Sequence, residues 1–392
     1  MKSIEKKVVG ITAFGHALSH FYMLILAGAL MAIVTDLNST LSQITAIGTL
    51  CYFIFGAGSI PAGIFVSATN PKMILKGFFL FSSAAALLIG LSKSIEIFTM
   101  GLTLLGLFGS LYHVSGITLI TQTITQRGKA LGIHGVAGSA GITLAPLIAG
   151  AILMILGWRW IYLLASGLGM IGFLILFFDR SIPVSHPQNA SQDTKSFDKK
   201  MIVAFALIIG VMMINGLVYR GFLTMLPTYV SKNISSGSPF TGGLLSTLIL
   251  SVGMIGQYFG GHFSDRVPMV RLYLITLLLS LPFLFILGFV QHLWIVGAGL
   301  FFALFHFPQQ PIENHLISRW MPPKWVGSGF GVKFAATFGV GALAAGFTGI
   351  IADRASISLV FPVLAGLVFL SSTLIFILIR YLEQNKVDMN IH

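Results

Sequence analysis

The chain of 392 residues is short of charge, of acids in particular, and of cysteine. Charged residues make up 9% of it, only 11 residues are Asp or Glu, and Cys51 is the one cysteine. A single cysteine excludes an intrachain disulfide, and no Gly-Lys-Ser or Gly-Lys-Thr loop is present to cradle the phosphates of ATP. Because 56% of the residues are hydrophobic, the chain cannot cover a soluble core with charge. The composition therefore indicates an integral membrane protein.

Long apolar runs, each sufficient to cross a bilayer, recur along the whole chain. A membrane helix needs about 20 consecutive apolar residues. We therefore predict an all-α membrane protein of twelve transmembrane helices, which cover residues 8–34, 42–66, 73–92, 96–124, 129–156, 159–178, 202–230, 240–263, 271–290, 293–319, 326–351 and 357–381.

The net charge of +12 comes from basic residues whose positions along the chain predict the membrane topology. If the N-terminus is cytoplasmic, most Lys and Arg residues fall on the cytoplasmic side, and the opposite side holds only Lys93, Arg159, Lys232 and Arg354. This bias fits the positive-inside rule with both termini in the cytoplasm. The basic balance therefore does not indicate a nucleic-acid partner, and MKSIEKK before a full-length span predicts a retained first helix.

One long polar connection, residues 179–200, divides the chain. We predict a six-helix bundle on either side of this cytoplasmic linker, at 1–178 and at 201–392. The two bundles resemble each other, since GLFGSLYH at 106–113 matches GLFFALFH at 299–306. One six-helix unit thus occurs twice, and we expect pseudo-twofold symmetry between its copies.

A second match pairs residues 128–150 with residues 327–349. Glycines coincide in both segments, and His134 of the first segment corresponds to Lys333 of the second. We expect these two side chains to face each other across the pseudo-twofold axis.

With two such halves around a cytoplasmic linker, the sequence resembles the major facilitator superfamily over essentially its whole length. The family's loop motif between helices 8 and 9 is matched by GHFSDRVPMVR, with Gly261, Asp265 and Arg266. The resemblance implies that these three residues form a gate on the cytoplasmic side. The first copy of the motif departs from the pattern, with Ser67 and Ala68 in place of the acid and the base.

Helices 4 and 5 look most similar to fosmidomycin-resistance-type and other drug-efflux carriers of that superfamily. The segment LYHVSG and the series Gly141, Ala145-Pro146 and Ala149-Gly150 carry this resemblance. The family's helix-4 arginine is replaced by Leu102, which favours a histidine or Glu313 as the proton carrier.

A polar stripe interrupts the segment GLFFALFHFPQQPIENHLISRW at 299–320. His306, Gln309, Gln310 and Glu313 lie on one helical face, where they need a cavity or a partner helix. Hydrogen bonds to neighbouring helices are the structural alternative for the first three, and a salt bridge to a loop cation is the alternative for Glu313. A buried carboxyl suits reversible proton binding, so proton coupling is predicted for Glu313, His113 and His306.

Buried cations indicate an anionic substrate, since each must meet a negative group. Arg220 could hold a carboxylate or phosphonate with its planar fork, or pair with Glu313 in the empty protein. The residues predicted to bind the substrate are Arg220, Lys333, His306, Gln309, Gln310, His20, His134, His113 and Tyr219.

Two further histidines, His16 and His20, stand four residues apart, a spacing that could clamp a metal ion. A third ligand would have to come from elsewhere in the chain. A pair lining the cavity and simple packing are the alternatives, and we predict no metal site and no cofactor.

The sequence thus predicts a secondary transporter that works by alternating access, with its cavity lined by helices 1, 4, 5, 7, 10 and 11. Proton-coupled efflux of a small anionic drug or metabolite is expected, and uptake of an organic acid or polycarboxylate is the alternative. The same scaffold could also carry an intramembrane enzyme or a receptor that does not transport. An enzyme would need a nucleophile with its base, or a metal site. We expect a monomer in a prokaryotic plasma membrane.

Overall fold

The computed structural model describes residues 3–124, 127–182, 199–234, 238–264, 266–320 and 331–385. All regular secondary structure in these ranges is helical. Most of the predicted linker and the predicted gate residue Asp265 lie outside the described residues.

The helices before the linker begin with α1, the first of the long apolar segments. They are α1 (Ser3–Asp36), α2 (Leu41–Ala57), α3 (Ser59–Ala68), α4 (Pro71–Gly90), α5 (Ile95–Gly109), α6 (Leu111–Thr123), α7 (Arg127–Ile155) and α8 (Trp158–Phe178).

The helices after the linker include one short π-helical segment, η2. They are α9 (Lys199–Ile234), α10 (Pro239–Ser264), α11 (Met269–Leu287), α12 (Leu293–His306), α13 (Gln309–Trp320), η2 (Ala335–Val340), α15 (Leu343–Arg354) and α16 (Val360–Gln384).

Eleven helices in the described part of the chain are long and apolar enough to cross a membrane. The predicted span 293–319 is instead two shorter helices, α12 and α13, separated by a turn at Phe307 and Pro308. Proline lacks the backbone N–H that continues a helix and its ring clashes with the preceding turn, so Pro308 and Pro311 account for the break.

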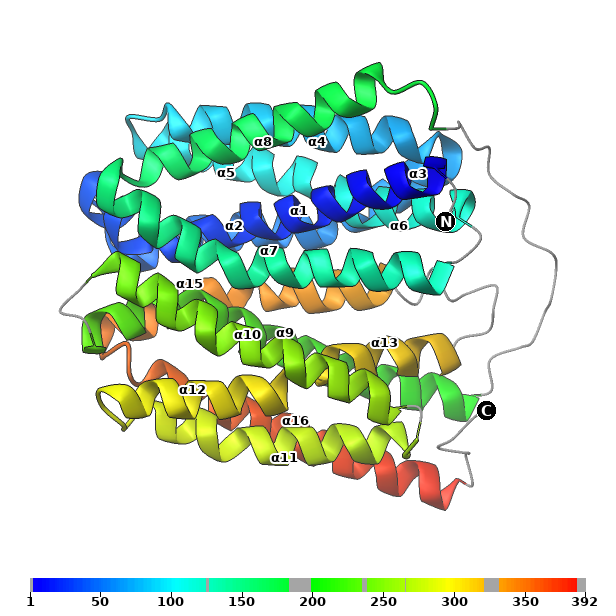
Figure 1. The fold of residues 1–392 in the computed structure, drawn as a ribbon. Coiled ribbons are helices and arrows are strands. Elements are labelled where there is room, and N and C mark those ends of the chain that lie inside the picture. Colours follow the sequence, from blue (N-terminus) through cyan, green and yellow to red (C-terminus); the bar gives the residue numbers. More distant parts are fainter. Residues whose placement is uncertain are drawn as a thin grey trace.

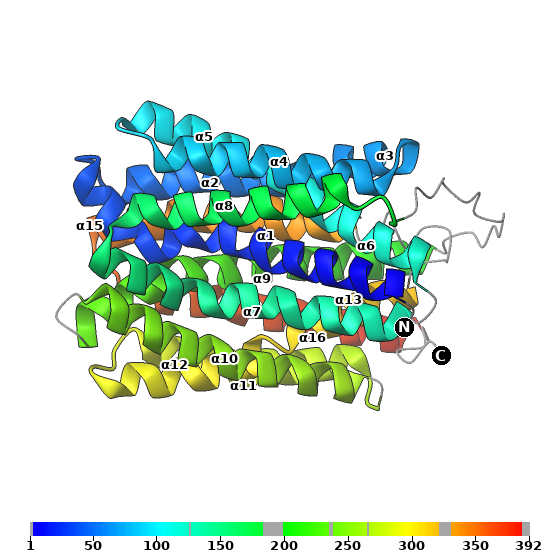
Figure 2. The same ribbon diagram turned by 45° about the horizontal axis from the view of Figure 1, so that its top comes forward.

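The long helices run side by side (Figures 1 and 2), and most of their buried residues are apolar. Before the linker, α1 packs on α7 and α4 packs on α8, while after it α11 packs on α12 and α16. The beginning of α1 and the end of α16 lie at the same end of the molecule (Figure 1).

The most extensive contacts between the described residues before and after the linker are those of α7 with α10, α2 with α15, α2 with η2, and α1 with α9.

The tightest of these contacts lie far from the chain termini. A Cβ atom on Gly243 would collide with the carbonyl of Pro146, and one on Gly349 would collide with the hydroxyl of Thr45. At the same end, the backbone N–H of Ser42 donates a 2.6 Å hydrogen bond to Asp353 Oδ2. The two parts of the molecule therefore pack closely at the end opposite the start of α1.

Candidate functional site

A buried ion pair occupies the polar stripe of α13. Lys333 Nζ lies 3.2 Å from Glu313 Oε2, and the two side chains are only 3% and 6% exposed. Lys333 stands on the helical turn 331–334 that leads into η2. An ion pair so far from water is retained only with good geometry and further hydrogen bonds, and loss of one partner leaves an uncompensated charge.

Neighbouring polar groups supply those further hydrogen bonds. The hydroxyl of Tyr273, on α11, donates to Glu313 Oε1 at 2.6 Å, and Asn215 Nδ2, on α9, donates to the Tyr273 oxygen at 2.5 Å. Lys333 Nζ also donates to Asn314 Oδ1 at 2.5 Å. The carboxylate and the ammonium are therefore fixed by three helices.

The rest of the stripe follows the turn between α12 and α13. Gln309 Nε2 lies 3.1 Å from His306 Nδ1, and Gln310 Oε1 accepts a 2.9 Å hydrogen bond from Gln257 Nε2 on α10. Ser139 on α7 donates to Gln257 Oε1 at 3.2 Å. This chain of amides links α13 to α7 across the two parts of the molecule.

The stripe faces a cavity between the two parts. The cavity consists of two adjoining hollows with empty volumes, open space at their mouths included, of about 520 and 620 Å³. Both hollows are lined by Gly216, Tyr219, Gln310, Thr337 and Phe338. The first extends over the ion pair, and the second extends to α1, α2 and α7. A small organic molecule would fit such a space.

Arg220, on α9, is the cation of the second hollow. Its guanidinium lies over the ring of Tyr52, 3.0 Å from the centroid, and one of its nitrogens donates to the carbonyl of Met23 at 3.1 Å. Within the described ranges Arg220 has no carboxylate partner, and its Nε is buried without a hydrogen bond. The guanidinium therefore leaves a positive charge facing the cavity.

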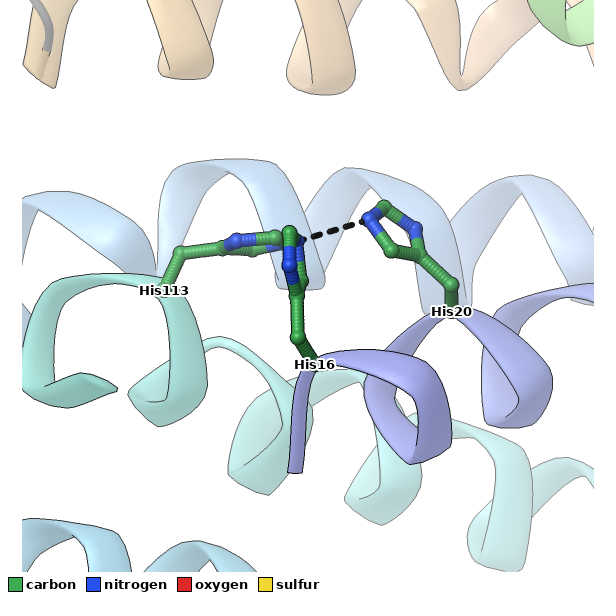
Figure 3. Close-up of side chains that lie close together, drawn as sticks. All are labelled: His16, His20 and His113. Atoms are coloured by element: carbon green, nitrogen blue, oxygen red, sulfur yellow. Dashed lines mark hydrogen bonds between the residues drawn. The ribbon is translucent and has the colours of Figure 1, made fainter. Parts of the chain in front are cut away.

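Four histidines gather on the other side of the cavity, on α1, α6 and α7. His16 stacks on His134 with ring centroids 4.0 Å apart, and His16 Nε2 lies 3.1 Å from His20 Nε2. The edge of His113 meets both α1 histidines at centroid distances of 5.2 and 5.3 Å. Figure 3 shows His16, His20 and His113 converging.

Most residues predicted to bind the substrate line this cavity, namely Arg220, Lys333, His306, Gln309, Gln310, His20 and Tyr219. His113 and His134 do not contribute to the lining and belong to the histidine cluster instead.

Two expected pairings are not formed. Glu313 does not pair with Arg220 or with a loop cation, because Lys333 holds its carboxylate. His134 does not face Lys333, because its Nε2 lies 2.9 Å from the hydroxyl of Tyr112 on α6.

The predicted gate is only partly within the described residues. Arg266 is exposed and forms no ion pair in the ranges given above. A Cβ atom on Gly261 would lie 3.8 Å from Pro311, so α10 passes close to α13 at this point. The gating role stays a prediction.

Sequence reasoning missed several polar residues of the site. Gln257, Tyr273 and Asn314 contact the predicted residues directly, and Tyr52 on α2 holds Arg220. The signal for Gln257 was a lone amide in an apolar helix, which needs a partner inside the bundle. Nothing in the sequence pattern distinguishes Tyr273 or Tyr52 from the other tyrosines.

The chain matches the model of the Major Facilitator Superfamily over residues 12–332 and 212–388. A probable L-galactonate transporter of Escherichia coli K12 is 21% identical over 284 residues, which are 68% of this chain and 62% of the relative. The multidrug resistance protein MdtG of Salmonella typhi is 24% identical over 252 residues, 62% of each chain. The matched part thus spans 62% of the length of either relative.

Solved structures of membrane transporters share the fold. A bacterial homolog of the human lysosomal transporter Spinster, inward-facing and unoccupied, superposes with a TM-score of 0.84 at 13% identity, covering 98% of both chains. A peptide transporter, POT, in complex with sulfate gives a TM-score of 0.76 at 13% identity over 97% of this chain and 94% of its own. The helices, the repeated segments and the family match agree, and the chain belongs to the Major Facilitator Superfamily.

Proposed function

We propose that the protein is a secondary active transporter that moves a small organic anion across a prokaryotic plasma membrane by alternating access. In this proposal α12 and α13 together form the twelfth membrane crossing. Residues 1–178 and 201–392 act as two six-helix halves, and both termini lie in the cytoplasm. The observation that carries the proposal is Arg220, a cavity cation without a carboxylate partner in the described part of the chain.

The charge balance of the cavity supports an anionic substrate. Glu313 neutralises Lys333 at 3.2 Å, so the guanidinium of Arg220 is left as the net charge of the lining. An isolated charge in a bilayer is costly unless it meets its counter-charge. A carboxylate or phosphonate could accept two parallel hydrogen bonds from this fork-shaped group.

Glu313 is the proposed proton-coupling residue. A proton taken up by its carboxylate gives a neutral carboxylic acid, which no longer holds the ammonium of Lys333 electrostatically. Lys333 then offers its charge to the anion, and release of the proton restores the ion pair. Glu313 and Lys333 both line the cavity. The proton on Glu313 therefore decides whether the ammonium of Lys333 can bind the anionic substrate.

Alternating access requires the two halves to part at one end while they close at the other. The close contacts of Gly243 with Pro146 and of Gly349 with Thr45 support a closed end opposite the start of α1. The other end, where the termini lie (Figure 1), would then be the open, cytoplasmic one.

Efflux in exchange for protons is the first candidate direction. The likeness of helices 4 and 5 to drug-efflux carriers and the relative named for multidrug resistance support it. In that mode the anion would bind to the guanidinium of Arg220 while the ion pair of Glu313 and Lys333 stays formed.

Uptake of an organic acid together with protons is the second candidate. It is favoured by the ion pair itself, since protonated Glu313 frees Lys333 for the anion, and by the relative named for L-galactonate. Neither an enzyme nor a receptor is proposed, because the relatives and the solved neighbours are named as transporters.

Counterflow in proteoliposomes tests the proposal. Vesicles loaded with an unlabelled organic acid should accumulate the labelled acid transiently, and a neutral analogue of the same size should compete poorly. A pH gradient imposed in each direction then separates the two candidates, since an inward proton gradient expels the solute in exchange and concentrates it in cotransport. Absence of counterflow for every acidic solute would contradict the assignment.

A further inference from the structure

We propose that His16, His20 and His113 form a binding site for a divalent transition metal ion, of which Zn²⁺ and Co²⁺ are the representative cases. Each of the three offers one ring nitrogen, and these nitrogens all lie within 4.8 Å of one another. Two of the ligands come from α1 and one from α6 (Figure 3). Imidazole nitrogen is a preferred ligand of zinc and of the neighbouring transition metals.

His16 is already oriented as a metal ligand. Its Nδ1 lies 2.7 Å from the carbonyl oxygen of His134, so Nδ1 carries the proton and Nε2 presents its lone pair. Metal-bound histidines characteristically donate their second N–H to a carbonyl or a carboxylate in this way. The ring cannot easily turn, because His134 stacks on one side and Gly138 leaves it just enough room on the other.

The distance between His16 and His20 fits a shared metal. Zinc–nitrogen bonds of about 2.0–2.1 Å in a tetrahedral site place two ligand nitrogens about 3.3 Å apart. The observed Nε2 to Nε2 distance is 3.1 Å. Without metal, His20 Nε2 must donate its proton to the lone pair of His16, and metal binding would require the His20 tautomer that carries this proton on Nδ1 instead.

His113 supplies the third ligand. It is only 6% exposed, and its Nε2 is buried without a hydrogen bond partner among the described residues. Such a nitrogen is costly to leave unsatisfied. The ring is held between aromatic neighbours, with Phe55 at its edge and Phe334 and Phe338 stacked at 5.9 and 6.0 Å. It therefore cannot turn towards water.

The fourth position can be reached from the cavity. His20 lines the hollow that also contains Arg220, and the guanidinium would repel a bare cation there. Water or the carboxylate of an anionic solute could complete a tetrahedral site with three histidines and offset that repulsion. The metal would also influence the other part of the molecule, because His113 stacks on Phe334, the residue next to Lys333.

Cobalt titration of the purified protein, with any polyhistidine tag removed, tests this site. Co²⁺ bound to three imidazoles gives visible absorption bands, and we expect them to saturate at one ion per chain and to disappear when Zn²⁺ is added. His113→Gln and His20→Gln should each weaken Co²⁺ binding at least about tenfold, as even the loss of an outer-shell partner does. His306→Gln is the matched control, because His306 is the repeat mate of His113 but hydrogen-bonds to Gln309, and it should leave the bands unchanged.

A measurement on the unaltered chain covers the case in which a variant fails to fold. X-ray absorption at the zinc edge should show three imidazole nitrogens at about 2.0 Å from the metal. Absence of saturable Co²⁺ bands, equal binding by all variants, or a zinc shell with fewer than two imidazoles would overturn the proposal. The site does not depend on the proposed anion transport, which is measured separately by counterflow.

Discussion

Corresponding positions of the two repeated segments carry different chemistry. His113 on α6 and His306 on α12 are repeat mates, yet the first joins a cluster of histidines and the second bonds to Gln309. Glu313 corresponds to Ile120, which is fully buried among apolar residues.

The mates His134 and Lys333 differ in the same way. His134 stacks on another histidine, whereas Lys333 holds a carboxylate. One sequence unit has thus been used twice, once to build a set of lone-pair donors and once to build a charge pair. The difference teaches that the repeat specifies backbone positions, while single substitutions at those positions decide what each half can bind.

The largest effect is expected from breaking the charge pair. Glu313→Gln leaves the ammonium of Lys333 buried and uncompensated, a loss of about 3–5 kcal/mol for buried pairs of this kind. Thermal unfolding of the purified protein should therefore shift to a clearly lower midpoint.

The double variant Glu313→Gln with Lys333→Met provides the control for that experiment. It removes both charges and should recover most of the lost stability. If the double variant is no more stable than Glu313→Gln alone, the two residues do not act as a pair.

A smaller effect is expected at Arg220, which is not one of the repeat mates compared above. Arg220→Gln removes the positive charge but keeps a hydrogen-bonding side chain over Tyr52. Losing hydrogen bonds to a charged group costs about 1.5–3 kcal/mol, so the Kd of an anionic substrate should rise about 10- to 100-fold. Binding of a neutral analogue should change little, and an equal loss for both ligands would assign Arg220 a structural role.

The smallest effect is expected at His306. His306→Gln removes a hydrogen bond to Gln309 and a stacked contact with Phe302, and the hydrogen bond by itself contributes about 0.5–1.5 kcal/mol. We expect a slightly lower unfolding midpoint and a smaller loss of substrate affinity than for Arg220→Gln. A loss as large as that of Glu313→Gln would mean that the second half depends on its histidine as much as on its charge pair.

The helices could be predicted because hydropathy acts locally. The eleven membrane-spanning candidates of the described chain follow from apolar runs, and the break at Pro308 follows from the missing backbone donor. For the site, the sequence predicted many of the polar residues but not which of them contact one another. That Lys333 would meet Glu313, and that His113 would join His16 and His20, depends on how α13 approaches the helical turn 331–334 and how α6 approaches α1.

The unpredicted members of the site show the same limit. Tyr273 is one of several buried tyrosines, and only its 2.6 Å contact with Glu313 gives it a role. Tertiary packing, which no local pattern encodes, selects such residues.

Transport driven by a pH gradient tests the central claim most directly. In proteoliposomes the unaltered protein should concentrate its anionic substrate against the solute gradient under one of the two directions of the imposed pH gradient, inward protons for cotransport or outward protons for exchange. Glu313→Gln should abolish this accumulation while exchange of labelled for unlabelled substrate continues in part, because the cation that holds the anion is still present. Unchanged pH-driven accumulation by Glu313→Gln would contradict the account and remove the charge pair from the coupling mechanism.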